Sequence, residues 1–435
     1  MEQVEYRNIL AILEREMHVA LGCTEPIAIA FAAAKAREVL GEMPECMEVY
    51  CSGNIVKNVK SVIVPNSGGM RGIEIAAILG VVAGRADKEL EVLSDVVQAD
   101  RVKAEALLQK GFCKSRIKTG VDNLYVEVRV KAGTHSACVV VMYHHTMIWR
   151  IERGTEVLFQ HAPVQEKQEQ GSLVSLQSIL AFARCARPED LESTIGREIA
   201  INTAISDEGL KNKYGAQIGR TIREVYGDDI KFRAIAAASA GSDARMSGCS
   251  LPVMINSGSG NQGMTVSLPV LEYAKELRSS KEELYRALAL SNLISIHIKK
   301  NIGDLSAFCG AVSAACGTGA AITFLHGGTD EQICDTIVNT IANVGGIVCD
   351  GAKASCAAKI MSAVNAAILG HEMSMRGIRF YGGDGIVQED IEDTIRSVGY
   401  VGRVGMEQTD LVILKIMLGE ISFRETCERQ RASDE

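Results

Sequence analysis

The chain has 435 residues, of which 47% are hydrophobic and 23% are charged, and its net charge is −8. This length predicts two or three domains with full hydrophobic cores, and the composition is typical of a globular protein. Because the chain is acidic and has no run of Lys or Arg, nucleic acids and anionic membranes are excluded as favoured partners.

The 13 cysteines and the amino terminus indicate the compartment. Residues 1–5 are acidic and do not have the pattern of a signal peptide. An odd number of cysteines in a long chain without a secretory signal favours free or metal-bound thiols over disulfides. We therefore expect a protein of the reducing cytoplasm.

Two helices are predicted near the amino terminus. Residues 5–17 show the apolar period of an amphipathic helix. Thr24-Glu25-Pro26 then predicts the start of an Ala-rich helix that reaches about residue 40, with Thr24 as a possible cap and Pro26 in the first turn.

Strands follow in the same part of the chain. Residues 48–52 and 61–65 predict short strands, and residues 121–130 and 137–143 predict longer, alternating ones. We expect the two longer strands to pair, with residues 131–134 in or near the turn. Residues 1–164 are therefore predicted to form a mixed α/β domain.

The remainder of the chain predicts mostly helices. Residues 165–171 are polar and unpatterned and are the expected linker. Residues 172–435 are rich in Ala and Gly, with a Gly-rich interruption at 241–263. An uncharged run at 305–325 is long enough to consider a membrane span, but its many small residues predict a buried, tightly packed helix. The expected fold class is α+β, with the mixed domain first and a mostly helical, Ala- and Gly-rich domain second.

Two Asn-Ser-Gly segments predict loops that bind an anion. Each follows an apolar run and precedes a helix-like stretch, and exposed backbone N–H groups beside Ser and Gly suit a small carboxylate. The alternative is ordinary turn chemistry that the chain uses twice. The candidate substrate-binding residues are Asn66, Ser67, Gly68, Gly69, Ser257, Gly258, Ser259 and Gly260.

A group of cysteines near the carboxyl end predicts a metal group. It contains none of the short C-x2-C pairs of zinc ribbons or bacterial ferredoxins. Cys316 and Cys334 lie in apolar helical patterns and are expected to be packing residues. Three soft ligands among small residues, without a convincing fourth, suit an iron–sulfur cluster with one open iron; these are Cys309, Cys349 and Cys356. The alternative is that all of them are small buried residues.

Cys23 is a candidate base, because it precedes the predicted helix at Thr24. The helix dipole and unpaired N–H groups there would lower the pKa of the thiol and favour a thiolate that takes a proton from carbon. The alternative is a small buried residue at a helix junction. His144 and His145 lie in a strand-like run, where neighbours point to opposite faces, so we do not expect them to bind one metal together.

Taken together, these segments resemble the L-cysteine desulfidase family, a relative of the iron–sulfur L-serine dehydratases. The resemblance covers nearly the whole chain and is carried by Leu21-Gly22-Cys23-Thr24-Glu25-Pro26, Asn66-Ser67-Gly68-Gly69-Met70-Arg71-Gly72, Gly258-Ser259-Gly260-Asn261-Gln262-Gly263 and Cys309…Cys349…Cys356. It implies one oxygen-sensitive [4Fe–4S] cluster per chain, held by Cys309, Cys349 and Cys356. It also implies that Cys23 is the proton acceptor, and a homodimer is expected on the same ground.

The resemblance implies an α,β-elimination that converts L-cysteine and water to pyruvate, ammonia and hydrogen sulfide, as in cysteine catabolism. The serine dehydratases run the same elimination on L-serine. In those relatives the last two cysteines are spaced more widely than Cys349 and Cys356, and an Asn-Ala-Ser-like stretch stands where this chain has residues 238–242. The choice between the two amino acids therefore stays open.

Other classes remain as alternatives. A pyridoxal-phosphate lyase could run the same elimination, and its candidate lysines are Lys299, Lys300, Lys353 and Lys359. A non-catalytic iron–sulfur or thiol redox sensor would need an effector module or a nucleic-acid surface, which the charge pattern does not offer. A structural zinc site is the third alternative.

Overall fold

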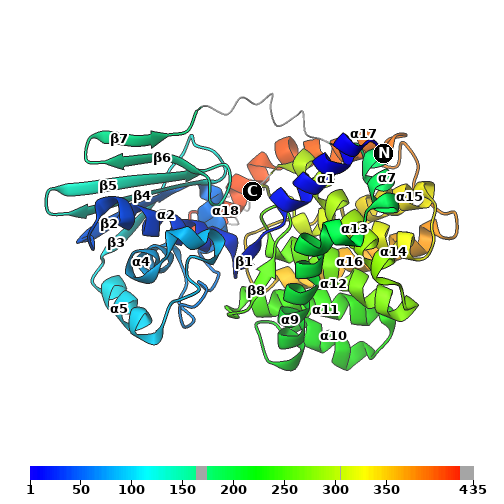
Figure 1. The fold of residues 1–435 in the computed structure, drawn as a ribbon, viewed down its shortest axis with the longest axis horizontal. Coiled ribbons are helices and arrows are strands. Elements are labelled where there is room, and N and C mark those ends of the chain that lie inside the picture. Colours follow the sequence, from blue (N-terminus) through cyan, green and yellow to red (C-terminus); the bar gives the residue numbers. More distant parts are fainter. Residues whose placement is uncertain (163–173, 304, 422–435) are drawn as a thin grey trace, which may run out of the picture.

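The computed structural model describes residues 1–162, 174–303 and 305–421. A six-stranded mixed sheet with its helices lies on one side of the molecule, and a large group of helices lies on the other (Figure 1). The predicted α+β class, with a mixed amino-terminal part and a mostly helical remainder, is confirmed. The linker predicted at 165–171 lies outside the described residues.

The sheet has the strand order β3-β2-β4-β5-β6-β7. β2 and β3 are parallel, and every other neighbouring pair is antiparallel. The two longer predicted strands are confirmed as a pair, with Gly133 and Thr134 between them. The strands are β2 (Cys46–Cys51), β3 (Cys113–Ile117), β4 (Tyr125–Ala132), β5 (His135–Met142), β6 (Ile148–Arg153) and β7 (Glu156–Gln160).

Helices α2 (Thr24–Leu40) and α4 (Ile73–Ala83) pack together in the amino-terminal part, and α2 covers one face of the sheet. Small residues allow this close approach: a Cβ at Gly80 would lie 2.3 Å from the carbonyl oxygen of Ala30. The valines of β4 alternate toward α2 and are buried, as a half-covered sheet requires. The predicted Ala-rich helix is therefore confirmed to residue 40. The shorter helices here are α3 (Gly53–Val59) and α5 (Gln98–Gln109), with the 3-10 helix η1 (Ala86–Glu91) between them.

The first 21 residues lie against the helical part. Helix α1 (Gln3–Glu16), which confirms the first predicted helix, buries Ile9 and Leu13 in one core cluster with Phe182 and Leu293. β1 (Val19–Leu21) pairs antiparallel with β8 (Pro252–Met254). The domain division 1–164 and 172–435 stays a prediction.

Helix α14 (Gly310–Leu325) lies among four other helices, which are α12 (Gly260–Leu277), α13 (Lys281–Ile302), α15 (Asp330–Val344) and α16 (Cys356–Ser374). A Cβ at Gly317 would lie 2.1 Å from the carbonyl oxygen of Ser291, so the two backbones nearly touch. From Gly310 onward, the uncharged run at 305–325 is thus a buried, tightly packed helix, as predicted, whereas residues 305–309 precede the helix. In the described part of the chain, no helix is both long and apolar enough to cross a membrane.

The described helices of this part, besides α14, are α7 (Leu176–Cys185), α8 (Pro188–Leu191), η2 (Glu192–Gly196), α9 (Arg197–Lys211), α10 (Ile218–Tyr226), α11 (Ile230–Met246), α12 (Gly260–Leu277), α13 (Lys281–Ile302), α15 (Asp330–Val344), α16 (Cys356–Ser374), α17 (Ile391–Tyr400), η3 (Val401–Gly405) and α18 (Glu407–Leu418).

Two local predictions are wrong. Residues 61–65 do not form a strand; an isolated bridge joins Ile63 to Arg71 instead, because the segment turns directly after α3. His144 and His145 lie in the turn between β5 and β6, so the alternation of a strand does not apply to them.

Candidate functional site

The structure brings two of the three predicted cluster ligands onto paired segments. Cys309 is the N-cap of α14, and Cys349 lies in the loop after α15. Phe308 and Val348 form an antiparallel bridge, and the backbone N–H of Cys309 donates to the carbonyl of Ile347 at 3.0 Å. Cys356 is the first residue of α16. The two short segments therefore hold Cys309 and Cys349 side by side.

The thiols of the three cysteines influence one another. Burial and the nearby Cys349 and Cys356 raise the pKa of Cys309 to about 12, although Lys359 acts in the opposite direction. Burial and Cys349 also raise the pKa of Cys356. Three thiolates in one neighbourhood repel one another, so their joint ionisation calls for a cation between them.

The donor set fits an iron–sulfur cluster. Within residues 1–162, 174–303 and 305–421, no three His, Cys, Asp or Glu side chains are arranged to hold one metal ion. In a cluster each cysteine binds a different iron, so its ligands stand further apart than those of a single ion. Three partly buried soft donors, whose charges a cationic group would balance, are what such a cluster requires.

Cys23 is buried and donates a hydrogen bond to a carboxylate. It is the N-cap of α2, it is 1% exposed, and its Sγ lies 3.0 Å from Oε2 of Glu25. Burial and the charge of Glu25 raise the pKa of the Cys23 thiol well above its usual range. The prediction that the helix start lowers this pKa is wrong, because burial and a neighbouring anion outweigh the helix dipole. Thr24 is not the N-cap either, since it is the first helical residue.

Glu25 is a buried anion at the centre of this group. Its carboxylate accepts hydrogen bonds from Cys23, from Thr24 at 3.1 Å and from the amide of Asn58 at 3.1 Å. Burial alone would raise the pKa of Glu25, but His145, the Cys23 thiol and Arg245 together lower it below its usual value. The carboxylate is therefore ionised at neutral pH.

The loop at residues 257–260 lies beside Cys23. The Thr24 hydroxyl donates to the carbonyl of Gly258 at 2.9 Å. The Ser257 hydroxyl is buried and has no hydrogen-bond partner among the described residues. Ser259 is the N-cap of α12 but makes no side-chain cap, so the first N–H groups of this helix are left for another acceptor. The geometry thus suits the small anion that the sequence predicts for this loop.

Further contacts connect this loop and Cys23 to the cysteine group. A Cβ at Gly310 would lie 2.7 Å from Cδ of Gln262, so the first turn of α12 lies against the residue after Cys309. Cys23 belongs to a small cluster with Val62 and Met246, and Cys356 packs against that cluster. Cys23, residues 257–260 and the three cysteines are therefore brought together where the amino-terminal and helical parts meet.

The loop at residues 66–69 is used differently. The amide of Asn66 donates to the carbonyl of Leu93 at 2.9 Å, and the Ser67 hydroxyl donates to the carbonyl of Met70 at 3.0 Å. Gly68 and Gly69 have φ values of 78° and 97°, as a tight turn requires. No hydrogen bond between described residues joins this loop to residues 257–260 or to the cysteines, so its role in substrate binding stays a prediction.

Sequence reasoning missed three residues of the site, Glu25, His145 and Arg245. A Cβ at Gly258 would lie 3.1 Å from Cε1 of His145, so this histidine reaches the loop from the sheet. Arg245 is 3% exposed, and its Nε donates to the carbonyl of Gly22 at 2.9 Å. For Arg245 the sequence did offer a signal, because this ionisable side chain lies near the end of a helix whose second half consists mostly of buried small residues.

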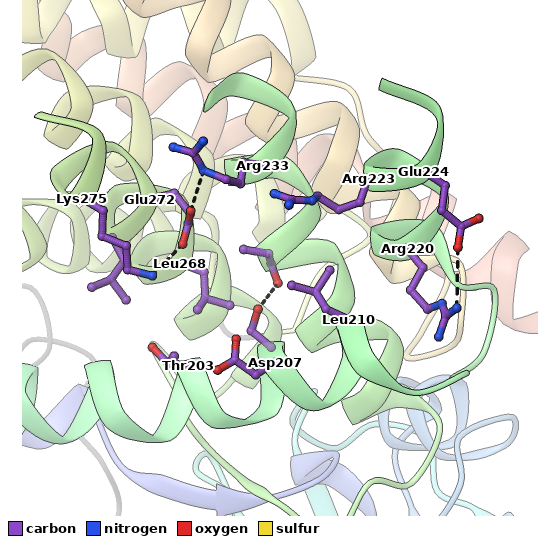
Figure 2. Close-up of a pocket in the computed structure, with 13 residues that line it drawn as sticks. Thr203, Asp207, Leu210, Arg220, Arg223, Glu224, Arg233, Leu268, Glu272 and Lys275 are labelled. Carbon is purple, nitrogen blue, oxygen red and sulfur yellow. Dashed lines mark hydrogen bonds and ion pairs between the residues drawn. The ribbon is translucent and has the colours of Figure 1, made fainter. Parts of the chain in front are cut away.

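Two cavities lie elsewhere. One, of about 390 Å³, lies among helices α9 to α12 and contains ion pairs such as those of Arg233 and Lys275 with Glu272 (Figure 2). The other, of about 450 Å³, lies over the face of the sheet that α2 does not cover. Neither is lined by a predicted site residue, so neither takes part in the site described above.

Sequence comparison identifies the family to which the chain belongs. A family model described as the serine dehydratase alpha chain matches residues 87–415. The chain belongs to this family. The match includes the three cysteines and residues 257–260, whereas Cys23 lies before it.

Individual relatives extend the similarity to nearly the whole chain. A UPF0597 protein of Lachnoclostridium phytofermentans is 52% identical over 415 residues, which are 95% of this chain and 100% of the relative. UPF0597 proteins of Desulfitobacterium hafniense and Fusobacterium nucleatum are 49% and 45% identical over 96% and 95% of this chain, and over 98% and 99% of their own lengths. The names of these relatives state no activity.

Proposed function

We propose that the protein is an iron–sulfur lyase that catalyses α,β-elimination on a small L-amino acid, with L-cysteine as the favoured substrate. Membership of the serine dehydratase alpha-chain family implies a lyase of that type. The observation that carries the proposal is the convergence of Cys23 and residues 257–260 on Cys309, Cys349 and Cys356. These elements are distant in sequence, and packing alone does not require thiols at all of these positions.

In this proposal Cys309, Cys349 and Cys356 hold a [4Fe–4S] cluster. When bound, the cluster would supply Lewis-acid chemistry for the departure of the β-heteroatom. Lys359 lies beside this group, since its Nζ donates to the carbonyl of Val348 at 2.8 Å and pairs with Asp350. Its charge therefore stabilises thiolates at this position.

Residues of the chain would bind the substrate and transfer its α-proton. The start of α12 binds the substrate carboxylate, with Ser257 beside it. Cys23 first gives its thiol proton to Glu25, to which it already donates a hydrogen bond. The thiolate then takes the α-proton of the substrate, while donors around the carboxylate stabilise the developing charge. The released enamine hydrolyses to pyruvate and ammonia.

L-Serine dehydration is the second candidate, because the matching family model is that of serine dehydratases. The thiol and hydroxyl leaving groups differ little in size, so residue identities do not decide between the two substrates. The pyridoxal-phosphate alternative is weakened, since Lys353 and Lys359 both form ion pairs with Asp350. The cytoplasm is the compartment that we propose, since it keeps thiols reduced.

The test is an anaerobic preparation in which iron and sulfide are quantified and pyruvate release is measured with L-cysteine and L-serine. We expect iron with sulfide, and faster release from L-cysteine together with hydrogen sulfide. Faster release from L-serine would assign the protein to the dehydratases. Stoichiometric zinc, or no pyruvate after reconstitution of the cluster, would refute the proposal. The same preparation, run on a sizing column, tests the proposed homodimer.

A further inference from the structure

Arg245 is a buried cation without an ionic partner in the described part of the chain. Its side chain is 3% exposed, and it forms one hydrogen bond there, from Nε to the carbonyl of Gly22 at 2.9 Å. The neighbouring arginines of the helical part, such as Arg233, form ion pairs with carboxylates. The charge of Glu25 acts on Arg245, but the two side chains form no ion pair. Because a guanidinium is almost never buried unless it is paired, Arg245 is suited to bind an anion from outside the chain.

The backbone around Arg245 leaves room for such an anion. A Cβ at Gly260 would lie 2.5 Å from Nε and 3.0 Å from Cζ of Arg245, so the guanidinium lies directly against the start of α12. The first turn of this helix has no side-chain cap. The buried Ser257 hydroxyl lacks a partner among the described residues. Three kinds of donor, a guanidinium, backbone N–H groups and a hydroxyl, therefore come together at one place.

We propose that Arg245 binds the α-carboxylate of the amino-acid substrate, together with the start of α12 and Ser257. Nε is used by Gly22, so the two terminal nitrogens are the donors that a carboxylate would meet. The arginine is held on the residue before Cys23, which places the anchored carboxylate close to the proposed base. The inference rests on the proposed function, and it assigns to Arg245 the selection of substrates that carry an α-carboxylate.

The charge balance of the pocket favours a zwitterion. Arg245 lowers the pKa of Glu25, so the two opposite charges lie in the same pocket without forming an ion pair. An α-amino acid carries the matching carboxylate and ammonium, whereas a dicarboxylate would place a second negative charge beside Glu25. We therefore infer an uncharged side chain on the ligand.

The experiment is calorimetric titration of the anaerobically purified protein, with and without reconstituted cluster. The probes are L-alanine, which has no leaving group, and L-alaninamide, which has no carboxylate. We expect wild-type protein to bind L-alanine roughly 10- to 100-fold more tightly than L-alaninamide, as a charge-assisted hydrogen bond predicts. Equal binding of the two probes, or no binding of L-alanine in either preparation, would overturn the inference without any variant.

Variants then assign the effect to one side chain. Arg245→Met should remove the preference for L-alanine, and Arg245→Lys should recover part of it, since the charge remains. Arg220→Gln is the matched control, because Arg220 also donates to a backbone carbonyl, that of Lys211 at 3.0 Å, but lies in the separate cavity of Figure 2. Thermal melting should show that the Lys variant is folded.

The outcomes separate this inference from the proposed function. If pyruvate release is normal but Arg245→Met leaves KM unchanged, the inference fails and the function stands. If no amino acid is converted but L-alanine binding still depends on Arg245, the function fails and the binding role stands. If Arg245→Met loses iron while the cluster-free variant binds L-alanine normally, Arg245 serves the cysteine group and the inference is wrong.

Discussion

At the scale of residues, the pair formed by Cys23 and Glu25 shows how an environment changes a side chain. A cysteine at a helix start is expected to ionise easily, yet burial and the adjacent carboxylate keep this thiol protonated. The 3.0 Å hydrogen bond also gives the thiol proton an acceptor. Cys23 can therefore act as a base only after its proton has moved to Glu25.

The proposed base and the proposed ligands should respond differently to substitution. Cys23→Ser should keep iron and sulfide but lower turnover by at least about 100-fold, the scale of a missing general base. Cys349→Ala should lose both the cluster and turnover. Iron analysis and pyruvate release measure the two effects, with Cys316→Ala as a buried cysteine control that should keep its cluster. Near-normal turnover of Cys23→Ser would remove Cys23 from the base role.

Glu198 should make the stability of the protein depend on pH. Burial raises its pKa to about 8, and only Asn292 donates to it, at 2.9 Å, among the described residues. Because the folded state holds this proton more tightly, the stabilisation is complete below pH 4.5 and is lost as the pH rises through about 8. We expect the free energy of unfolding to fall by about 4 kcal/mol between pH 5 and 9.

Denaturant unfolding across this range, compared with Glu198→Gln, isolates the contribution of Glu198. The glutamine variant should lack the difference, since its amide does not ionise. If the free energies of unfolding of wild type and variant changed in parallel with pH, Glu198 would not be protonated in the folded protein.

At the scale of elements, small residues determine how closely the helices approach one another. The cluster ligand Cys309 caps α14, whose Gly317 lies against the backbone of α13. A shift of α14 would therefore move Cys309 relative to Cys349. The packing of this helix pair and the geometry of the cysteine group are thus linked.

Gly317→Val should destabilise the protein by about 3 kcal/mol or more, because even its Cβ would lie 2.1 Å from the carbonyl oxygen of Ser291. Gly405→Ala is a control, since its Cβ would meet no atom closer than 4.0 Å. Urea unfolding compares the two variants with wild type. A Gly317→Val protein of normal stability would show that α13 and α14 are not packed this closely.

At the scale of the whole molecule, the site depends on contacts between distant segments. β1 pairs with β8, Thr24 binds Gly258, and Arg245 binds Gly22. Each of these contacts joins the beginning of the chain to the helical part. The proposed base is therefore held against the cysteine group by contacts between distant segments, and not by its neighbours in sequence.

Binding of the cluster should stabilise the segments that carry its three cysteine ligands. Metal ligands that repel one another as thiolates gain stability when a cationic group binds them. Anaerobic reconstitution should therefore raise Tm and slow amide exchange at residues 305–309 and 347–356. Cys356→Ala should show neither change. Equal Tm values for the loaded and cluster-free wild-type protein would contradict this view.

Much of the local structure could be predicted from the sequence. Periodicity predicted α1, α2 and the pair β4 and β5, because these patterns depend on near neighbours. The small-residue run at 305–325 correctly predicted a buried helix. The strand at 61–65 and the environment of His145 were mistaken, since a tight turn and a distant packing partner decided them.

By itself, the sequence determined the fold class, the elements with strong periodicity and the residue types that can do the chemistry. Only the tertiary structure decided that residues 257–260 and Arg245 lie against the segment that carries Cys23 and Glu25, and that Arg245 is buried without an ionic partner in the described chain. The physical reason is that ionisation and anion binding depend on burial and charges at a few ångströms. Those neighbours come from segments more than 200 residues apart.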